Sequence, residues 1–249
     1  MSNHLVVTRH YSNATQLAQE AAGSWLADVE VARESGRPYF VALSGGRIAQ
    51  TFFSAVAGSP KVRKDLLDSV HFFWGDERCV PPTDSESNFG IAQRLLLEPL
   101  RIPADRIHRI RGEEHPEAAA AQAEAEICGT VPLNETGQPV LDLVILGLGE
   151  DGHVASLFPG ERESEMFSKR VYRDVVGSKP PPNRVTLGYG AIIAARKAWV
   201  LASGPGKENA LRESLQLADK TPCGRVLARR TETHVFTDIQ TRSQTAGGN

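Results

Sequence analysis

The chain has 249 residues, of which 41% are hydrophobic, and it carries 28 lysines and arginines against 30 aspartates and glutamates. A chain of this length can form one core, and a formal net charge of −2 creates no field that gathers nucleic acid or anionic lipid. Any anionic ligand must therefore be held by a local site. We expect one domain over residues 1–240 and a disordered tail over residues 241–249.

The cysteines and the N-terminus indicate the compartment. Cys79, Cys128 and Cys223 lie far apart and match no Cys-x-x-Cys spacing, so any disulfide pairing leaves one thiol over. The N-terminus lacks a charged leader followed by an apolar core, and no segment approaches the roughly 20 apolar residues of a membrane span. We therefore expect a protein of the reducing cytoplasm, a monomer or weak homodimer, with no membrane and no nucleic acid as partner.

Apolar periodicity predicts helices and strands that alternate along the chain. The predicted helices cover residues 15–34, 47–57, 88–97, 118–127 and 207–217. The predicted strands cover residues 39–43, 70–74, 141–146, 197–202 and 234–237. The strands are short continuous apolar runs, which are typical of strands buried on both faces. Such alternation predicts right-handed crossovers and a doubly wound α/β fold, with a mainly parallel sheet and helices on both faces.

Ligands in such folds bind beyond the carboxyl ends of the strands, so the loops that follow the predicted strands are the candidate sites. The first loop is Ser44-Gly45-Gly46. Its glycines let backbone amides approach a ligand, and the next helix turns its positive end toward the same place. A phosphate would fit there, and a tight turn without a ligand explains the pattern equally well.

The second loop places two acids and a base, Asp76, Glu77 and Arg78, directly after the strand over 70–74. Such a loop can orient sugar hydroxyls and a phosphate. The alternative is a solvated turn that ends in a helix cap at Asn88, because opposite charges are common neighbours on protein surfaces.

The third loop follows the most apolar strand and contains three glycines in the spacing Gly-x-Gly-x-x-Gly, at Gly147, Gly149 and Gly152. This spacing suggests a dinucleotide-binding loop. We reject that interpretation because Glu150 and Asp151 would face the pyrophosphate, and because Pro159 shortens any helix that could help to bind it.

The same loop contains His153, two residues after Asp151. The carboxylate can hold the imidazole in one tautomer and favour its protonated form, an arrangement that suits a general base. A lone histidine is more often structural, but glycines on both sides, two neighbouring carboxylates and a position at a strand end favour function.

Two cations complete the candidate set. Arg184 follows a triproline segment, and Lys207 stands at the start of a predicted helix, where a cation is unfavourable unless an anion shares the site. An ordinary surface lysine is the alternative. The chain has no His-Glu-x-x-His, Gly-x-Ser-x-Gly or Walker motif, which disfavours a zinc hydrolase, a serine esterase and a nucleotide kinase. We expect no metal and no cofactor.

Taken together, five blocks closely resemble the 6-phosphogluconolactonase family, which shares its fold with glucosamine-6-phosphate deaminases. The blocks are Leu43-Ser44-Gly45-Gly46, Asp76-Glu77-Arg78 with Ser87-Asn88, the run from Gly147 through Asp151-Gly152-His153 to Pro159, Arg184-Val185-Thr186, and Gly206-Lys207. The resemblance runs from about residue 40 to residue 215, and the glycine-histidine block is its most specific part.

The resemblance implies a single Rossmann-like α/β domain that hydrolyses 6-phospho-D-glucono-1,5-lactone to 6-phospho-D-gluconate in the oxidative pentose phosphate pathway, without a metal. It further implies that His153 activates water and that Asp151 orients this histidine. By position, Asp76 and Arg78 would line the pocket, and the phosphate would be held by Ser44, Gly45, Gly46, Arg184 and Lys207. The sequence departs from the common family pattern at Arg47-Ile48-Ala49, where Ser-Thr-Pro is usual, so one hydroxyl contact to the phosphate is missing. Arg47 is the candidate to replace it if its side chain faces the pocket, which the sequence leaves open.

Two alternatives remain beside lactone hydrolysis. Deaminase or isomerase chemistry needs a further acid, but the position of the deaminase glutamate is occupied here by Phe158, which favours the lactonase. A sugar-phosphate sensor would need the cations but not Asp151 and His153. The sequence leaves open whether Asp76 or His153 accepts the proton of water, and whether Cys79 is reactive.

Overall fold

The computed structural model describes residues 4–63, 65–216 and 219–240. The expected disordered tail over 241–249 and the last residue of the helix predicted over 207–217 lie outside the described residues.

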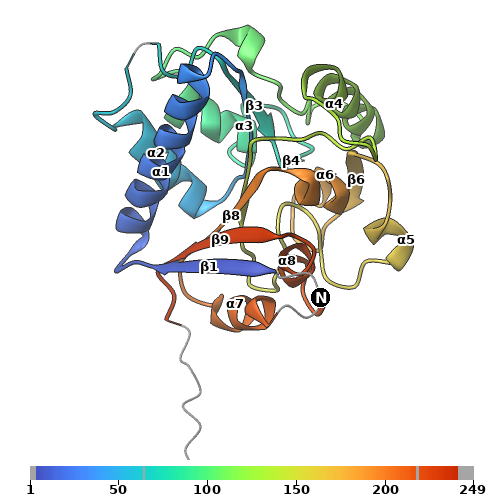
Figure 1. Cartoon of the computed structure of the whole chain (residues 1–249). Helices are drawn as coiled ribbons and strands as arrows, with labels where there is room; N and C mark the ends of the chain where they lie inside the picture. Colours follow the sequence, from blue (N-terminus) through green and yellow to red (C-terminus); the bar gives the residue numbers. More distant parts are fainter. Residues whose placement is uncertain (1–3, 64, 217–218, 241–249) are drawn as a thin grey trace, which may run out of the picture.

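The main sheet has six strands in the order β1 (Leu5–His10), β9 (Glu232–Thr237), β8 (Lys197–Ala202), β5 (Leu143–Gly147), β2 (Tyr39–Leu43) and β3 (Val70–Trp74). All neighbours pair in parallel (Figure 1). Strand β2, which lies between β5 and β3, is buried along its whole length, which explains its continuous apolar run. The predicted doubly wound α/β class with a mainly parallel sheet is confirmed.

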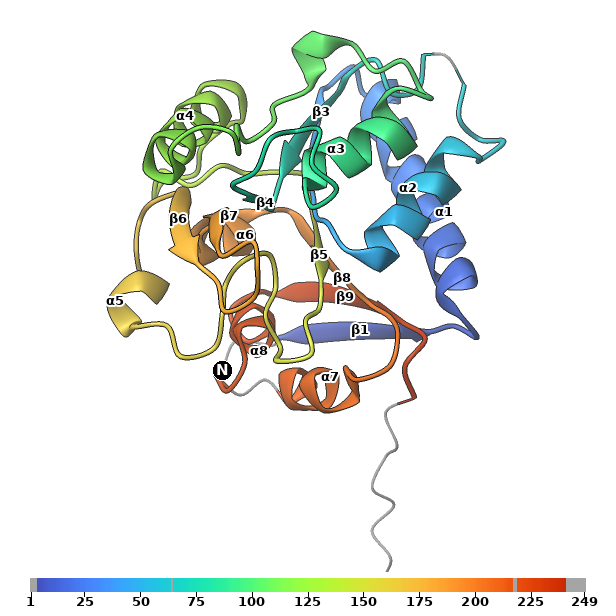
Figure 2. The ribbon, with the colours of Figure 1, turned by 180° about the vertical axis from the view of Figure 1, so that it is seen from behind.

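Helices cover both faces of this sheet. They are α1 (Ala14–Glu34), α2 (Arg47–Ala57), α3 (Asn88–Ala92) with a following π-helical turn η1 (Gln93–Leu97), the 3-10 turn η2 (Ala104–Arg106), α4 (Pro116–Thr130), α5 (Glu163–Met166), α6 (Tyr189–Ala194), α7 (Glu208–Leu215) and α8 (Pro222–Leu227). Helices α1 and α2 pack together on one side, and α4, α6 and α8 lie on the other (Figures 1 and 2). None of the described helices combines the length and apolar character that a bilayer crossing requires.

Local chemistry explains where the longest helix begins and how it packs. The side chain of Asn13 accepts a hydrogen bond from the backbone N–H of Gln16, which caps α1. Along the helix the fully buried Trp25 meets the rings of Phe52 on α2 and Phe72 on β3. These aromatic contacts join helix and sheet into one continuous core.

A second, antiparallel sheet consists of β4 (Asp76–Arg78), β7 (Asn183–Leu187) and β6 (Tyr172–Val176). We did not predict it: the sequence suggested a turn at residues 76–78, and no strand over 172–176 or 183–187. Strand β1 and the short helices α5, α6 and α8 were also not predicted. In the observed register, Asp76 lies opposite Thr186 and Arg78 lies opposite Arg184.

The chain order of the main sheet reverses at β2. From β2 the chain continues to β3 on one side, and the next strand of the main sheet, β5, lies on the other side. The loops that follow β2 and β5 therefore diverge, and this divergence opens a crevice at the carboxyl ends of the strands. The loop after β3 joins the same place, because the Gly75 N–H donates to the carbonyl of Leu43 at 2.7 Å.

Candidate functional site

A cavity of about 120 Å³ lies at this crevice, and we call it the strand-end cavity. It brings together all the predicted site residues except Asp151, which contacts the cavity residue His153. Its lining consists of Ser44, Gly45, Gly46, Arg47, Ile48, Asp76, Arg78, Asn88, Gly147, Leu148, His153, Ala155, Arg184 and Lys207. Residues from six separate segments of the chain thus line one small, polar space.

His153 and Asp151 form a close pair at this cavity. The imidazole Nδ1 lies 2.5 Å from Oδ1 of Asp151, and the same oxygen accepts the backbone N–H of His153 at 3.1 Å. Partial burial raises the pKa of Asp151, but the charge of His153 and these hydrogen bonds outweigh burial, so the net pKa is lowered. An ionised Asp151 accepts the Nδ1 proton, which leaves the Nε2 lone pair of the neutral imidazole available to a reactant.

The glycines of this loop make room for the histidine. A Cβ atom on Gly149 would lie 2.1 Å from Nδ1 of His153, so only glycine lets the imidazole lie against the backbone there. Gly152 has a φ of +81° and would carry a Cβ only 2.6 Å from Thr221. No helix starts at Gly152, and the next described helix is α5, so the loop lacks the helix N-terminus that a dinucleotide-binding loop uses.

Asp76 is fixed by neutral hydrogen-bond donors. Its side chain is 5% exposed, and its Oδ2 accepts the hydroxyl of Ser156 at 2.7 Å. The Asn88 amide donates to the backbone carbonyl of Asp76 at 2.9 Å. Ser156 therefore ties the histidine loop to β4, a role that the sequence did not reveal although Ser156 lies within the recognised glycine-histidine block.

Glu77, which belongs to the loop predicted to orient sugar hydroxyls and a phosphate, does not line the cavity and instead organises the segment behind it. Its buried carboxylate accepts the backbone N–H groups of Arg78 and Asn88 at 2.7 Å, that of Phe89 at 2.8 Å, and the hydroxyl of Ser87 at 3.1 Å. Burial raises its pKa to about 7, although the backbone hydrogen bonds favour the charged form. The only signal in the sequence was its place between Asp76 and Arg78.

The cations of the cavity lie close to one another. Arg78 and Arg184 are direct cross-strand neighbours, a pairing of like charges that is unfavourable by itself. Glu86 pairs with Arg78 at 3.2 Å, but Arg184 has no acidic partner of its own among the described residues. Burial, followed by the charge of Arg78, lowers the pKa of Arg184, and burial followed by the charge of Arg47 lowers that of Lys207. Among the described residues no salt bridge engages Arg47, Arg184 or Lys207. These charges favour an anionic ligand.

Backbone groups at two helix starts add to this positive character. Helix α2 begins after Gly46, which has a φ of +93°, and α7 begins after Lys207, and no side chain caps either helix. A Cβ on Gly45 would lie 1.8 Å from Oδ1 of Asn88, so glycine permits this close approach. The Ser44 hydroxyl donates to the carbonyl of Ile145 at 2.7 Å, so its proton is already used within the fold.

The family described as glucosamine-6-phosphate isomerases/6-phosphogluconolactonase matches residues 12–235 of the chain. The chain belongs to this family. The match extends the resemblance seen in the sequence to nearly the whole α/β fold.

Relatives within the family carry the lactonase name. The 6-phosphogluconolactonase of Streptomyces coelicolor is 38% identical over 211 residues, which cover 80% of this chain and 78% of that protein. The 6-phosphogluconolactonase of Haemophilus influenzae is 34% identical over 198 residues, covering 79% and 82%. The solved structure of 6-phosphogluconolactonase from Trypanosoma brucei superposes with a TM-score of 0.82 at 28% identity, covering 94% of this chain and 96% of that one.

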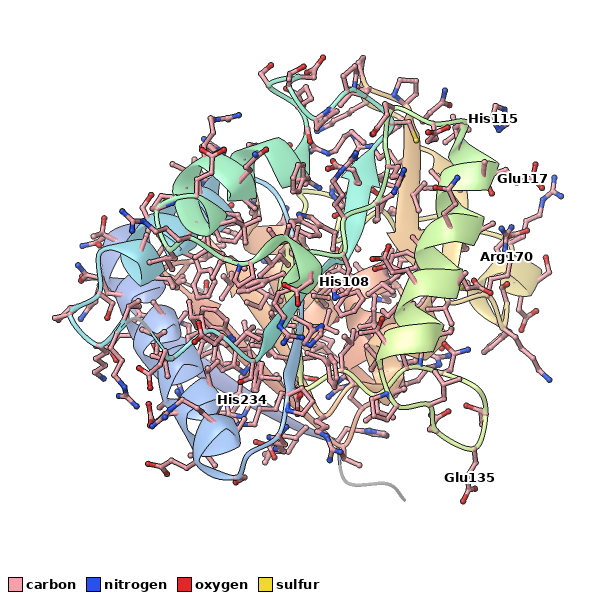
Figure 3. All side chains as sticks on the ribbon, turned by 90° about the horizontal axis from the view of Figure 1, so that it is seen from above. His108, His115, Glu117, Glu135, Arg170 and His234 are labelled. Atoms are coloured by element: carbon pink, nitrogen blue, oxygen red, sulfur yellow. The ribbon has the colours of Figure 1, made fainter. Side chains whose placement is uncertain are left out.

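The other described histidines do not line the strand-end cavity. His108 bonds to His71 and to Glu126 of α4, His115 precedes α4, and His234 bonds to Glu232 (Figure 3). Within the family fold, His153 is therefore the imidazole that the described structure brings to the clustered cations.

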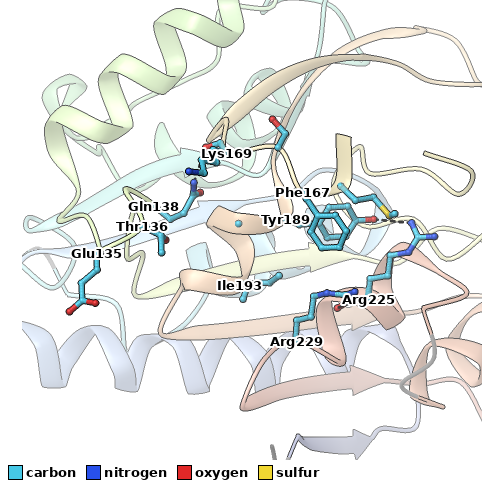
Figure 4. A pocket seen from close by; sticks show the side chains of 12 residues that line it. Glu135, Thr136, Gln138, Phe167, Lys169, Tyr189, Ile193, Arg225 and Arg229 are labelled. Carbon is cyan, nitrogen blue, oxygen red and sulfur yellow. Dashed lines mark hydrogen bonds between the residues drawn. The ribbon is translucent and has the colours of Figure 1, made fainter. Parts of the chain in front are cut away.

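A larger cavity of about 490 Å³ lies elsewhere, and we call it the α6–α8 cavity. Figure 4 shows Phe167, Tyr189, Arg225 and Arg229 around it, and none of the residues predicted for the site lines it. Arg229 is paired with Asp219 at 2.5 Å, and the Arg225 Nε donates to the Asp219 carbonyl at 3.0 Å. Its two arginines thus already have partners within the fold.

Cys79 follows β4 directly. It is half-buried and unpaired, and burial raises its pKa to about 11. It is therefore a neutral thiol at physiological pH rather than a reactive thiolate.

Proposed function

We propose that this chain hydrolyses 6-phospho-D-glucono-1,5-lactone to 6-phospho-D-gluconate in the pentose phosphate pathway. The names of its relatives support this reaction. The observation that carries the proposal is that an imidazole–carboxylate pair, His153 and Asp151, shares one small cavity with three cations, Arg47, Arg184 and Lys207, that have no acidic partner among the described residues. A phosphorylated neutral ester needs both an anion site and a base.

In this proposal the phosphate binds between the start of α2 and the cations. The backbone N–H groups at Gly45 and Gly46 and the positive end of α2 face it, with charge-assisted hydrogen bonds from Arg47, Arg184 and Lys207. Ser44 contributes through its main chain rather than its hydroxyl proton, which is donated to Ile145.

His153 acts as the general base. Because Asp151 holds Nδ1, Nε2 takes a proton from a water molecule as the water oxygen attacks C1 of the lactone. In the tetrahedral intermediate the bond between C1 and the ring oxygen then breaks, and the same Nε2–H protonates that leaving oxygen. The products are the open-chain acid and a neutral imidazole ready for another turnover.

Arg78 and Asp76 have supporting roles. The Arg78 guanidinium lines the cavity and stabilises the negative charge that develops on the carbonyl oxygen. Asp76, whose Oδ2 accepts the Ser156 hydroxyl, holds a sugar hydroxyl. The exposed fraction of its side chain is small, which favours His153 over Asp76 as the acceptor of the water proton.

Three further properties complete the proposal: the need for a metal, the compartment, and the distinction from isomerase chemistry. The steps above use no metal, so we expect activity to persist after treatment with a chelator. Three unpaired cysteines support a reducing compartment, the cytoplasm. The isomerase alternative needs a further proton carrier, and the residue beside His153 is Phe158, which cannot transfer a proton.

A direct assay tests the proposal. The purified protein should accelerate loss of 6-phosphogluconolactone above its spontaneous rate, and His153→Ala should lower kcat by roughly 10² to 10⁴ while product binding is retained. His234→Ala is the matched control, because His234 bonds only to Glu232 outside the cavity. Unchanged turnover in His153→Ala would remove His153 from the base role, and an inactive wild-type protein would refute the lactonase function.

A further inference from the structure

We propose that Phe158 is a positioning residue that holds the general base and the phosphate-binding arginine in register and stabilises the charged form of the base. The inference rests on the proposed lactonase function, and it assigns Phe158 an active part in that site rather than the mere absence of a glutamate.

The ring of Phe158 contacts both functional groups. Its centroid lies 5.2 Å from that of the His153 imidazole, with the two planes inclined by 50°. The guanidinium carbon of Arg184 lies 5.7 Å from the same Phe158 centroid. The imidazole is thus confined by three contacts, the Gly149 backbone, the Asp151 carboxylate and the Phe158 ring.

The backbone brings Phe158 back to His153 through a tight turn. Val154 and Leu157 form an isolated bridge, and the Leu157 N–H donates to the Val154 carbonyl at 3.0 Å. Between them Ala155 adopts a φ of +49°, a conformation that costs free energy for a residue other than glycine. Ser156 bonds to Asp76, so the turn that delivers Phe158 is anchored to β4.

A glycine on the neighbouring loop makes room for this arrangement. A Cβ on Gly177 would lie 3.0 Å from Cζ of Phe158 and 3.3 Å from Nε of Arg184. Gly177 has no positive φ, so its backbone conformation does not require glycine. The space that a side chain at position 177 would take is occupied by the Phe158 ring and the Arg184 guanidinium.

The electrostatic consequence concerns the intermediate state of the reaction. Once His153 has taken a proton, the Phe158 ring contacts two cations, the imidazolium and the Arg184 guanidinium. Arg184 lies over the ring, and the tilted imidazolium lies within the roughly 6 Å over which the ring quadrupole attracts a cation. An aliphatic side chain of similar size would fill the same space but would not stabilise the imidazolium.

The test compares Phe158→Leu with the wild-type protein. Loss of the ring should lower kcat/KM about tenfold, with a lower kcat from the misplaced base and a higher KM from the loosened Arg184. The acid limb of the pH–rate profile should move to lower pH, because the imidazolium loses a stabilising contact. The other charged groups around His153 are unchanged in this variant, namely Asp76, Arg78, Asp151, Arg184 and Lys207.

A double-mutant cycle guards against a nonspecific loss of structure. Gly177→Ala should impair the wild-type protein, because the methyl group displaces the ring, and should cost less when Phe158→Leu is already present. Phe167→Leu is the matched control: Phe167 also lies under an arginine, Arg229, at 5.9 Å, but is 61% exposed and outside the strand-end cavity. Its kinetics should match wild type.

A second readout does not depend on turnover. The NMR titration of the His153 ring in the free protein should shift to lower pH in Phe158→Leu and stay in place in Phe167→Leu. An unmoved titration, or an equal cost of Gly177→Ala in both backgrounds, would overturn the role of Phe158. An inactive wild-type protein whose His153 titration does respond to Phe158→Leu would instead refute the lactonase function and retain the contact.

Discussion

The strand-end cavity and the α6–α8 cavity both contain basic side chains, but the strand-end cavity gathers three, Arg47, Arg184 and Lys207, without an acidic partner among the described residues, and only its Arg78 is paired, with Glu86. Arg229 is held by Asp219 in the α6–α8 cavity, whereas Arg184 and Lys207 in the strand-end cavity have no salt bridge among the described residues. The strand-end cavity is therefore the better candidate for a ligand site, although its volume is about 120 Å³ against about 490 Å³ for the α6–α8 cavity. Unsatisfied charge identifies the site better than volume does.

The largest effect in this comparison should come from the backbone beneath the imidazole. Gly149→Ala places a methyl group where Nδ1 of His153 now lies, at 2.1 Å, so the base must move and kcat should fall roughly 10²-fold. In the α6–α8 cavity, Gly190→Ala places its methyl 2.9 Å from the side chain of Gln138, and kcat should not change. Steady-state kinetics with thermal unfolding as a folding check would measure both. Equal losses in the two variants would mean that the imidazole position is not critical.

How much of this contrast the sequence could predict depends on the range of the interactions. Strands β2 and β5 were predicted because their apolar runs are local, and the loops after them followed from the rule that ligands bind at strand ends. The second sheet was not predicted, because β4 has three charged residues and no apolar pattern. Its pairing with β7 spans about a hundred residues, and no local pattern encodes it.

The same reasoning applies to the site residues. The predicted His153 and Asp151 are two residues apart, so their contact could be foreseen from sequence. The contact between Ser156 and Asp76 joins residues 80 positions apart, and the ring of Phe158 meets Arg184 only because β7 runs beside β4. These partners depend on the tertiary fold, so only the structure reveals them.

A second prediction concerns the cations themselves. Lys207→Met or Arg184→Met should raise KM for the lactone tenfold or more, because a hydrogen bond to a charged group contributes about 1.5–3 kcal/mol. In contrast, Arg225→Met and Arg229→Met should change KM less than about twofold, since exposed pairs contribute ~1 kcal/mol or less and only to stability. Initial rates at several lactone concentrations give all four values. A comparable KM increase in Arg225→Met and Arg229→Met would mean that the phosphate binds in the α6–α8 cavity instead of the strand-end cavity.

The smallest expected effect is a difference in how Glu77, behind the strand-end cavity, and Asp219, the partner of Arg229, contribute to folding stability as pH changes. The pKa of Glu77 is raised by burial to about 7 from its ordinary 4.5, so its favourable contribution to folding is present at low pH and declines as pH rises between these values. The hydrogen bond from Arg229 instead lowers the pKa of Asp219, so its contribution is constant above pH 5 and is lost only in stronger acid. Urea unfolding at pH 5 and pH 7.5 should show the stability advantage of wild type over Glu77→Gln shrinking with pH, and that over Asp219→Asn staying constant. An advantage over Glu77→Gln that widens toward pH 7.5 would show that the four hydrogen bonds to this carboxylate outweigh its burial.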